Sequence, residues 1–390
     1  MSNPPFPNLQ YCVRCCIPET QEGITFDHMG VCQACQSQEQ KIHIDWSERE
    51  KALRGIIENA KAKAGNNYDC ILPISGGKDS TFQMHVLTQI YDMKPLAVTF
   101  SHNWYSETGW YNLMNSLEEF NVDHIMFTPN RKLVNKVARQ SLPGIGDSCW
   151  HCHAGVGAFP MQVAVRFKIP LLIWGESIAD YSGRASHLNP VHKFDRDYFT
   201  KVSAKLHPHQ MVTDDLTERD LSPFNVPTAE ECEAIGLHGI HLGDYIFWDE
   251  ERQTEFVREH YGWKETRVEG TYKCYKSAEC IMPGVHDFSC YQKRGYGRAS
   301  FHAGMDVRNG LLTREEAFEL IKTFDAQRPE ALDYYLNITD MTEEEFYDTL
   351  AKHRQPQLVN TLIPVVDKLE QNEERVLPFV TQLIAKHRGE

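Results

Sequence analysis

Short apolar runs and longer amphipathic stretches alternate through the middle of the chain. The apolar runs occupy residues 70–74, 96–100, 124–127 and 171–174, and the amphipathic stretches between them occupy residues 80–91, 110–120 and 159–167. Short apolar runs of this kind are typical of strands that are buried on both faces, and strands that alternate with helices form βαβ units. The pattern therefore predicts an α/β fold with a parallel, doubly wound sheet.

Two segments that flank this alternating region have other patterns. Ser47 and Glu50 have the spacing of a capping box, which predicts a helix from there to about residue 64. Residues 187–226 are polar and contain several prolines, so we expect an irregular segment that faces the substrate rather than a strand of the sheet.

The two ends of the chain differ from its middle. The first 45 residues hold five cysteines and little periodic apolar pattern, which indicates a small zinc-ribbon module. After residue 310 the pattern is helical, with capping-box spacing at Thr313 and Glu316, again at Thr342 and Glu345, and an amphipathic tail over residues 358–386. We therefore predict a zinc-binding module, an ATP pyrophosphatase domain and a helical region at residues 1–45, 46–275 and 276–390.

The composition narrows the classes of partner. The formal net charge is −14 at pH 7, which disfavours nucleic acid because non-specific binding to it depends on lysine and arginine. No run reaches the roughly 18 apolar residues that a membrane span needs, and the N-terminus lacks the basic-then-apolar order of a signal peptide. We therefore expect a cytoplasmic protein without a membrane partner. In that compartment the 12 cysteines are expected as thiols, and their CxxC spacing points to metal.

A glycine-rich turn follows the first predicted strand. Residues 71–81 read ILPISGGKDST, which is an apolar run, two glycines and the start of a helix. Gly76 and Gly77 lack a Cβ atom, so backbone N–H groups can close around phosphate oxygens at the positive end of the helix. The turn is not a Walker A loop, because that motif needs glycine at Leu72 and serine or threonine at Asp79. An ordinary strand-to-helix turn is the alternative interpretation.

The order Ser-Gly-Gly-Lys-Asp-Ser resembles the PP-loop of GMP synthetases, asparagine synthetases and tRNA-thiolating enzymes. These enzymes split ATP to AMP and pyrophosphate on a HUP-like sheet. In this interpretation Lys78 neutralises charge as pyrophosphate leaves and Asp79 helps to position Mg²⁺, so both are candidate catalytic residues. The resemblance implies that the pyrophosphate end of ATP is bound by Ser75, Gly76, Gly77, Lys78, Asp79 and Ser80.

Further polar residues follow two other predicted strands. Doubly wound sheets bind ligands at the carboxyl ends of their strands. PP-loop enzymes often carry a Gly-x-x-x-Ala-Asp stretch after the fourth strand, so Glu176 and Asp180 are candidate magnesium ligands or catalytic residues. The alternative is that they only cap the next helix. Ser101 and His102 follow the second predicted strand, where such folds receive adenine.

Two CxxC pairs lie near the N-terminus. Cys12 and Cys15 are separated by 16 residues from Cys32 and Cys35, which is the spacing of a four-thiolate zinc ribbon or knuckle. Cys16 follows the first pair directly and could shift the register. Four thiolates around one ion leave no open position for a substrate, so the predicted zinc is structural.

A further CxxC pair, Cys149 and Cys152, lies between the third and fourth predicted strands, with histidines interleaved. One pair cannot complete a metal site, and we expect Cys280 rather than Cys290 as the third thiolate. Three thiolates with an open position suit an iron–sulfur cluster, whereas cysteine and histidine together suit zinc. Buried free thiols beside core histidines are the alternative interpretation.

Beyond these motifs, nearly the whole chain resembles the N-acetyl sugar amidotransferase family of bacterial surface-glycan (lipopolysaccharide) biosynthesis. The resemblance implies that ATP adenylates the acetamido oxygen of an N-acetyl sugar, after which ammonia displaces AMP and leaves an acetamidino group. The resemblance also includes Arg298. Together with Lys293 and Arg294, Arg298 could bind the triphosphate or a sugar carboxylate. The alternative interpretation is that these three residues lie in a solvated loop. The residues that carry the resemblance are the two N-terminal CxxC pairs and residues 73–81, 146–153, 169–176, 241–245, 279–286 and 293–299.

Two other functions are compatible with the same loop: a sulfur transferase acting on tRNA or a small molecule, and a non-catalytic nucleotide-binding subunit. The net charge weighs against tRNA. For an amidotransferase, the source of ammonia matters as well. A class I glutaminase needs a nucleophilic cysteine in a Gly-x-Cys-x-Gly elbow, and the nearest match, at residues 30–34, uses the predicted zinc ligand Cys32. We therefore expect a separate glutaminase subunit as partner.

Overall fold

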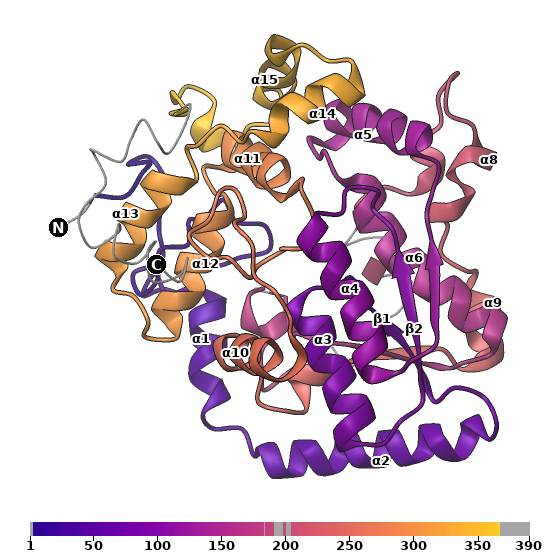
Figure 1. Cartoon of the computed structure of the whole chain (residues 1–390). Helices are drawn as coiled ribbons and strands as arrows, with labels where there is room; N and C mark the ends of the chain where they lie inside the picture. The colour runs from indigo at the N-terminus through magenta and orange to yellow at the C-terminus, as the bar shows by residue number, and fades with distance from the viewer. Residues whose placement is uncertain (1–2, 183, 191–197, 200–203, 367–390) are drawn as a thin grey trace.

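The computed structural model describes residues 3–182, 184–190, 198–199 and 204–366 (Figure 1). Its centre is a five-stranded sheet in the order β3-β2-β1-β4-β5, and every neighbouring pair is parallel. The four strands expected from the sequence are present, and a fifth joins them at the edge. The fold is therefore confirmed as α/β with a parallel sheet. The strands are β1 Cys70–Pro73, β2 Pro95–Phe100, β3 His124–Phe127, β4 Leu171–Trp174 and β5 His238–His241.

The sheet is covered on both faces. In β1, Ile71 packs into the cluster that contains the α6 residues, whereas its neighbour Leu72 packs into the cluster of α2, α3 and α4. Helix α6 (Trp150–Phe167) lies across β1, β2 and β4. Because strands enclosed in this way meet apolar neighbours on both sides, β1 and β2 are buried along their whole length, and their sequences are continuous apolar runs.

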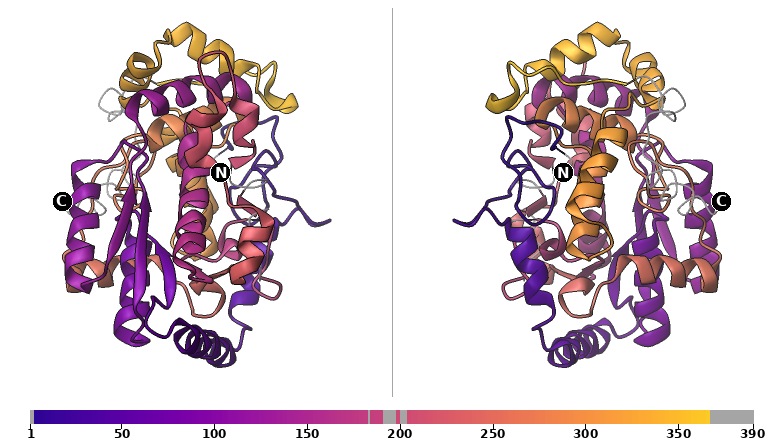
Figure 2. Two further views of the ribbon diagram at one scale, coloured as in Figure 1. Left: turned by 90° about the vertical axis from the view of Figure 1, so that its right-hand side faces the viewer. Right: turned by 90° about the vertical axis from the view of Figure 1, so that its left-hand side faces the viewer.

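The helices enclose the sheet and extend beyond it. In Figure 1, α2 runs along the bottom of the molecule and is seen end-on in Figure 2, whereas α14 and α15 lie at the opposite end. Among the helices of the described residues, none combines the length and apolar character needed to cross a membrane. The α-helices are α1 Gln33–Lys41, α2 Trp46–Ala64, α3 Lys78–Met84, α4 Glu107–Phe120, α5 Arg131–Ile145, α6 Trp150–Phe167, α8 Glu218–Leu221, α9 Ala229–Ile235, α10 Glu250–Tyr261, α11 Pro283–Arg294, α12 Arg298–Arg308, α13 Arg314–Phe324, α14 Ala331–Thr339 and α15 Glu343–Ala351.

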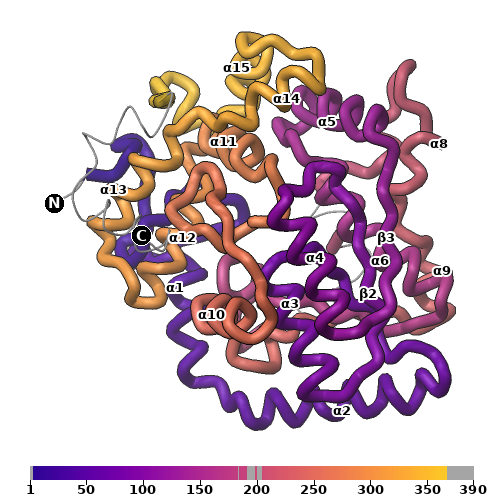
Figure 3. The backbone as a smooth tube through the Cα atoms, viewed as in Figure 1, coloured from indigo at the N-terminus to yellow at the C-terminus, as the bar shows by residue number. Residues whose placement is uncertain are grey.

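Short helical turns complete the framework. The π-helical turn η1 continues α3, so the two together cover the helix predicted at residues 80–91. Figure 3 follows the chain through these connections. The turns are η1 His85–Ile90, η2 Ile178–Asp180, η4 Pro208–Met211, η5 Ser222–Phe224, η6 Leu242–Asp244 and η7 Pro356–Leu358.

One predicted cap is wrong. The helix expected from residue 47 begins at Trp46, and Asp45 caps it: Asp45 Oδ1 accepts hydrogen bonds from the N–H groups of Ser47 and Glu48, each at 3.1 Å. An aspartate at this position satisfies two N–H groups that have no partner within the helix. Ser47 therefore lies inside the first turn, and it does not form the predicted capping box with Glu50.

The segment expected to face a substrate packs elsewhere in its described part. Met211, Leu216 and Phe224 are buried in the cluster of α6. Gln162 of α6 also donates a hydrogen bond to the Pro223 carbonyl at 3.1 Å. This part of residues 187–226 thus packs against α6, whereas His187 hydrogen-bonds to Asp180, and no described residue of 187–226 lines the cleft beside the glycine-rich turn after β1.

The C-terminal region follows its sequence pattern where it is described. Thr313 with Glu316 and Thr342 with Glu345 each form both hydrogen bonds of a capping box, as predicted. Of the predicted amphipathic tail, residues 367–386 lie outside the described residues. One hydrophobic cluster joins residues from all three predicted segments, among them Phe6, Leu142 and Val285. The segments therefore share a core, and the division at residues 45 and 275 stays a prediction.

Candidate functional site

The turn after β1 closes on itself where α3 begins. Ser75 Oγ accepts a hydrogen bond from the Gly77 N–H at 3.3 Å, and Ser80 Oγ donates one to the Gly77 carbonyl at 2.9 Å. Gly76 has a φ of +87°, and a Cβ atom there would lie 2.7 Å from the Gly109 carbonyl oxygen. Both the conformation and the space at position 76 therefore require glycine.

This turn forms one wall of a cleft of about 450 Å³. The sheet order runs outward in opposite directions from β1 and β4, and doubly wound sheets bind ligands beyond the carboxyl ends of strands at such a point. The opposite wall comes from residues 275–279 and from α11 and α12. Of the predicted site residues, those that line the cleft are Ser75, Gly77, Lys78, Asp79, Ser80, Glu176 and Arg298.

Lys78 and Asp79 form an ion pair at the cleft wall. Lys78 Nζ lies 2.6 Å from Asp79 Oδ1, and the lysine side chain is only 2% exposed. The ammonium group also lies 5.7 Å from the centroid of the Tyr275 ring. A desolvated ammonium attracts an anion more strongly than one in water, so Lys78 is placed to bind an anion in the cleft. Asp79 is 31% exposed and is open to a cation from the same side.

Lys276 joins two carboxyl groups beside the turn. Its Nζ lies 3.5 Å from Glu176 Oε1 and forms a closer ion pair with Glu250. Burial raises the pKa of Glu176 well above its ordinary value, and the Asp79 carboxylate adds to this effect. Burial also opposes ionisation of Glu250, but Lys276 and Lys78 outweigh it and hold the pKa of Glu250 well below its ordinary value. Of these two carboxyl groups, Glu176 is therefore the more readily protonated.

Four charged residues at or beside the cleft were not predicted from the sequence: Glu250, Lys276, Glu279 and Asp287. Glu250 is the first residue of α10, and Lys276 lies in an irregular segment, so neither belongs to a periodic pattern. Glu279 lines the cleft and belongs to the stretch at residues 279–286 that carries the family resemblance. The resemblance at residues 279–286 therefore offered a sequence signal from which Glu279 could have been predicted as a site residue.

Glu279 is held against the beginning of α4. The Ser106 N–H donates a hydrogen bond to the Glu279 carbonyl at 3.0 Å. A Cβ atom on Gly109 would lie 2.2 Å from Glu279 Cα, so only glycine lets the two backbones approach this closely. Burial raises the pKa of the Glu279 carboxyl group, and the Asp79 carboxylate adds to the effect.

We predict that Gly109→Ala destabilises the protein and displaces Glu279. Overpacking of this kind costs about 1–3 kcal/mol of unfolding free energy. Gly144→Ala is the matched control, because a Cβ atom there meets nothing within 4 Å and the residue lies inside α5. The control should be neutral or up to about 1 kcal/mol more stable. Urea denaturation of both variants measures the difference, and equal stabilities would contradict the close approach.

Four residues predicted to bind ATP or to act in catalysis are not among those that line the cleft: Gly76, Ser101, His102 and Asp180. Asp180 Oδ1 accepts hydrogen bonds from Lys41 Nζ at 2.8 Å and from His187 Nε2 at 3.0 Å. Ser101 and His102 follow β2 and are buried, and burial lowers the pKa of His102 to about 3. The structure therefore places neither the Asp180 carboxylate nor the predicted adenine contacts in the wall of the cleft.

The four N-terminal cysteines converge as the spacing predicts. Cys12 Sγ lies 3.8 Å from Cys35 Sγ, and Cys15 Sγ lies 3.7 Å from Cys32 Sγ. All four sulfur atoms lie within 4.8 Å of one another. Zinc–sulfur bonds of about 2.3 Å in a tetrahedron place the sulfur atoms about 3.8 Å apart, so the cluster has the dimensions of a zinc site. The four buried cysteines can therefore bind a metal such as zinc.

This cysteine cluster lies against the helices that follow the cleft. Arg314 Nε of α13 donates hydrogen bonds to the carbonyls of Cys12 and Cys15, at 3.1 and 2.9 Å. A Cβ atom on Gly304 of α12 would lie 2.5 Å from Ile17 Cδ1. Figure 3 shows the N-terminal chain beside α12 and α13. The cluster is thus packed against α12, which begins at the cleft residue Arg298.

The second group of cysteines, at Cys149, Cys152 and Cys280, does not converge as the four N-terminal cysteines do. Cys149, Cys152 and Cys280 pack in one hydrophobic cluster, but their sulfur atoms do not all lie within 4.8 Å of one another. Burial raises the pKa of all three thiols, to about 12 for Cys152. Cys290, the other predicted third ligand, lines the cleft instead. The three thiols are therefore apolar neighbours, as in the buried-thiol interpretation.

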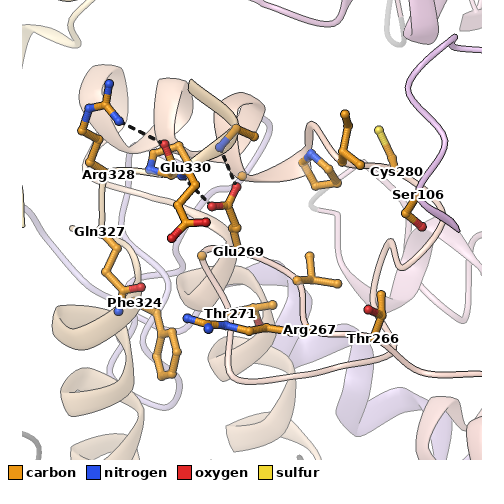
Figure 4. Close-up of a pocket in the computed structure, with 17 residues that line it drawn as sticks. Ser106, Thr266, Arg267, Glu269, Thr271, Cys280, Phe324, Gln327, Arg328 and Glu330 are labelled. Carbon is orange, nitrogen blue, oxygen red and sulfur yellow. Dashed lines mark hydrogen bonds between the residues drawn. The ribbon is translucent and has the colours of Figure 1, made fainter. Parts of the chain in front are cut away.

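A second cavity, of about 380 Å³, adjoins the cleft wall (Figure 4). Glu269 points toward the beginning of α14, where Glu269 Oε1 accepts a hydrogen bond from the Glu330 N–H at 2.6 Å. Cys280 lies at the other end of this cavity. Since Glu279 lines the cleft and Cys280 lines the cavity, these two consecutive residues separate the two spaces.

The fold and the cleft define a parallel α/β protein with a charged cleft at the carboxyl edge of its sheet. Residues 269–363 match the family model described as "LPS biosynthesis protein WbpG-like, C-terminal domain", which supports a glycan-biosynthesis family and suggests an enzyme. The chain is also 28% identical over 105 residues to an uncharacterized protein, MJ1599, of Methanocaldococcus jannaschii. That similarity covers 27% of this chain and 37% of the relative.

Proposed function

We propose that the chain is an ATP-dependent, AMP-forming amidotransferase that acts on an N-acetyl sugar. The acetamido oxygen attacks the α-phosphorus of ATP, pyrophosphate leaves, and ammonia then replaces the oxygen with release of AMP. The product is an acetamidino sugar. An amide carbonyl is a poor electrophile, and adenylation of its oxygen supplies the leaving group that the amide lacks.

The single observation that carries the proposal is the composition of the cleft. The glycine-rich turn and Glu176 come from the carboxyl ends of β1 and β4, and Arg298 comes from the region that matches the WbpG-like family. A loop of the pyrophosphatase type and a region of the glycan-biosynthesis type thus share one cleft. This arrangement supports a reaction in which ATP and a sugar meet there.

The cleft offers the chemical groups that ATP and Mg²⁺ need: hydrogen-bond donors for phosphate oxygens and carboxylate oxygens for the ion. The backbone of the turn and the Lys78 ammonium offer donors to phosphate oxygens, and Asp79 offers a carboxylate oxygen of the kind that Mg²⁺ takes. Glu176 is a second carboxyl group on the same side. In the proposal Lys78 stabilises the charge that develops on departing pyrophosphate, and Arg298 orients the substrate.

Product analysis tests the proposal. Purified protein is incubated with candidate N-acetyl sugars, ATP, Mg²⁺ and an ammonium salt, and the mixture is analysed by mass spectrometry. We expect AMP only when sugar and ammonium are both present, and a product lighter than its parent by the difference between O and NH. A product heavier by the difference between sulfur and oxygen, formed with a sulfur donor, would instead identify a sulfur transferase. No turnover with any donor would favour a non-catalytic nucleotide-binding subunit.

We further propose a separate glutaminase partner, because the described residues contain no glutaminase elbow around a cysteine. Cys32, the nearest sequence match, lies within the four-cysteine cluster. We predict that the isolated chain forms amidine with ammonium but not with glutamine, and that an added glutaminase restores the reaction with glutamine. Amidine formation from glutamine by the isolated chain would exclude the need for a partner.

Zinc is the metal that we propose for Cys12, Cys15, Cys32 and Cys35. An iron–sulfur cluster at Cys149, Cys152 and Cys280 stays a prediction, and it would require the three sulfur atoms to move closer together than they are in the structure. The test is the visible absorbance of protein purified without oxygen, since an iron–sulfur cluster absorbs visible light and a zinc site does not.

A further inference from the structure

Asp147, His153 and His286 meet at the margin of the cleft. Their ligand atoms all lie within 4.8 Å of one another. Asp147 precedes α6, His153 lies in the first turn of α6, and His286 lies in the first turn of α11. The side chains are 9%, 34% and 27% exposed, in that order, so the group is enclosed but reachable. None of the sequence motifs accounts for it as a group.

The distances within this group suit a shared ion. His286 Nε2 lies 3.8 Å from Asp147 Oδ1, which is too long for a hydrogen bond. Two ligand atoms that each lie about 2.1 Å from one tetrahedral ion are about 3.4 Å apart. The distance between His286 Nε2 and Asp147 Oδ1 is close to this value. His153 Nδ1 lies 2.9 Å from Asp147 Oδ2 and completes a compact set of donors.

The groups around these ligands are arranged as they are around metal sites. A histidine that binds metal with one ring nitrogen usually bonds to a carboxylate through the other. His286 meets this condition, because its Nδ1 bonds to Asp287 Oδ1 at 2.9 Å while its Nε2 faces Asp147. Asp287 is held in turn by an ion pair with Arg298. Asp147 Oδ1 is oriented by the Cys149 N–H at 2.7 Å.

We propose that Asp147, His153 and His286 bind a divalent metal ion of the zinc class, distinct from the ion at the four cysteines. Two imidazole nitrogens and one carboxylate oxygen suit zinc or ferrous iron rather than magnesium, which takes oxygen ligands. Three protein ligands leave a coordination position for water or substrate, as in catalytic metal sites. The group adjoins the cleft, because His286 and its neighbour Asp287 line it.

This proposal concerns metal binding and does not depend on the amidotransferase reaction. It also differs from the iron–sulfur prediction, since the ligands are nitrogen and oxygen and Cys149 contributes only its backbone N–H. The competing interpretation is a metal-free network in which Asp147 hydrogen-bonds to His153. Metal content and the type of ligand separate these three possibilities without any assay of activity.

The first experiment counts zinc. Full-length protein is saturated with Zn²⁺, freed of excess metal by gel filtration and analysed for its elements. We expect two equivalents in the wild type and one in His286→Ala and in Asp147→Ala. The equivalent that remains at the four cysteines indicates that a variant is folded. His124→Ala is the matched control, because His124 is a part-buried histidine that bonds to Thr99 Oγ1 far from any such cluster, and it should keep both equivalents.

The second experiment identifies the ligands in the wild type itself, so it does not rely on a variant that folds. Cobalt(II) bound by thiolates gives an intense near-ultraviolet band, whereas cobalt bound by nitrogen and oxygen gives only weak visible bands. We expect the thiolate band to reach its full intensity at one equivalent of cobalt per protein. The weak visible bands should continue to grow until two equivalents have been added. Saturation of all signals at one equivalent would overturn the proposal. So would a thiolate band that doubles with the second equivalent, since cysteines would then be the ligands.

Discussion

Lys78→Met is expected to abolish the formation of AMP while the protein stays folded. The methionine side chain retains most of the volume of the buried lysine stem and removes the charge that faces the cleft. Removal of one group that stabilises developing charge costs about 10²–10³ in rate, so the loss should be at least 100-fold. Asp79→Asn should cause a loss of similar size, because the carboxylate both pairs with Lys78 and is the candidate Mg²⁺ ligand.

Lys94→Met is the control for this prediction. Lys94 is an exposed lysine directly before β2, so it lies at the edge of the parallel sheet opposite the glycine-rich turn, and its Nζ lies 4.9 Å from the centroid of the Tyr68 ring. Pyrophosphate and AMP release should be unchanged in this variant, and circular dichroism should show all three proteins folded. Wild-type AMP formation in both Lys78→Met and Asp79→Asn would remove the phosphate assignment of the turn.

The parts of the fold that were predictable are those that local sequence determines. β3 and β4 have the predicted bounds because both are short apolar runs that turn residues interrupt at the strand ends, although β3, at the edge of the sheet, is only half-buried. The glycine-rich turn after β1 was predictable for the same reason, since its glycines, Lys78 and Asp79 are consecutive, whereas its binding of phosphate stays a prediction. The four-cysteine cluster was predictable because the CxxC spacing holds both sulfur atoms of a pair on one side of a short turn.

The beginning of α6 could not be predicted because tertiary packing overrides local signals there. Gly155 and Pro160 lie inside this helix, although each residue normally weakens or breaks one. The glycine has a packing reason: a Cβ atom at Gly155 would lie 2.2 Å from the ring of Phe100 in β2. The helix therefore presses against the sheet at a residue whose sequence signal indicates a break.

The remaining differences between the predicted site and the structure concern side chains whose partners are distant in the chain. Asp180 follows β4 as expected, but Lys41 from α1 and His187 draw its carboxylate away from the turn. Lys276 reaches the cleft from an irregular segment and pairs with Glu250 of α10. Neither pairing has a local signature, so the sequence could not predict that the Asp180 carboxylate is held outside the cleft or that Lys276 lines it.

Cys35→Ser is expected to remove zinc from the N-terminal cluster and to unfold that module. A tetrahedral site that loses one thiolate binds its ion far more weakly, and in small zinc modules the free energy of metal binding is the free energy of folding. The module's own hydrophobic cluster consists of the four cysteines and a few neighbours, so much of its internal packing depends on the metal. Elemental analysis should therefore show one equivalent of metal less than in the wild type.

Cys16→Ala is the control that fixes the register of the cluster. Cys16 is as buried as the four ligands and follows Cys15 directly, but its sulfur contacts the Ser300 carbonyl at 4.0 Å rather than the other thiols. This variant should keep its full zinc content and lose only a small part of its stability. If Cys16→Ala instead lost the zinc and Cys35→Ser kept it, the ligand set derived from the two CxxC pairs would be wrong.

Loss of zinc should also weaken AMP formation, although the cluster has no contact with the phosphate turn. The carbonyls of Cys12 and Cys15 hold Arg314 of α13, and Ile17 packs on Gly304 of α12. Helix α12 begins at Arg298, which lines the cleft, so an unfolded module leaves this arginine less well positioned. We expect the Michaelis constant for the sugar to rise more than the turnover number falls, because in the proposed reaction Arg298 orients the sugar, whereas Lys78 remains in place. An unchanged Michaelis constant in zinc-free Cys35→Ser would show that the module and the cleft are independent.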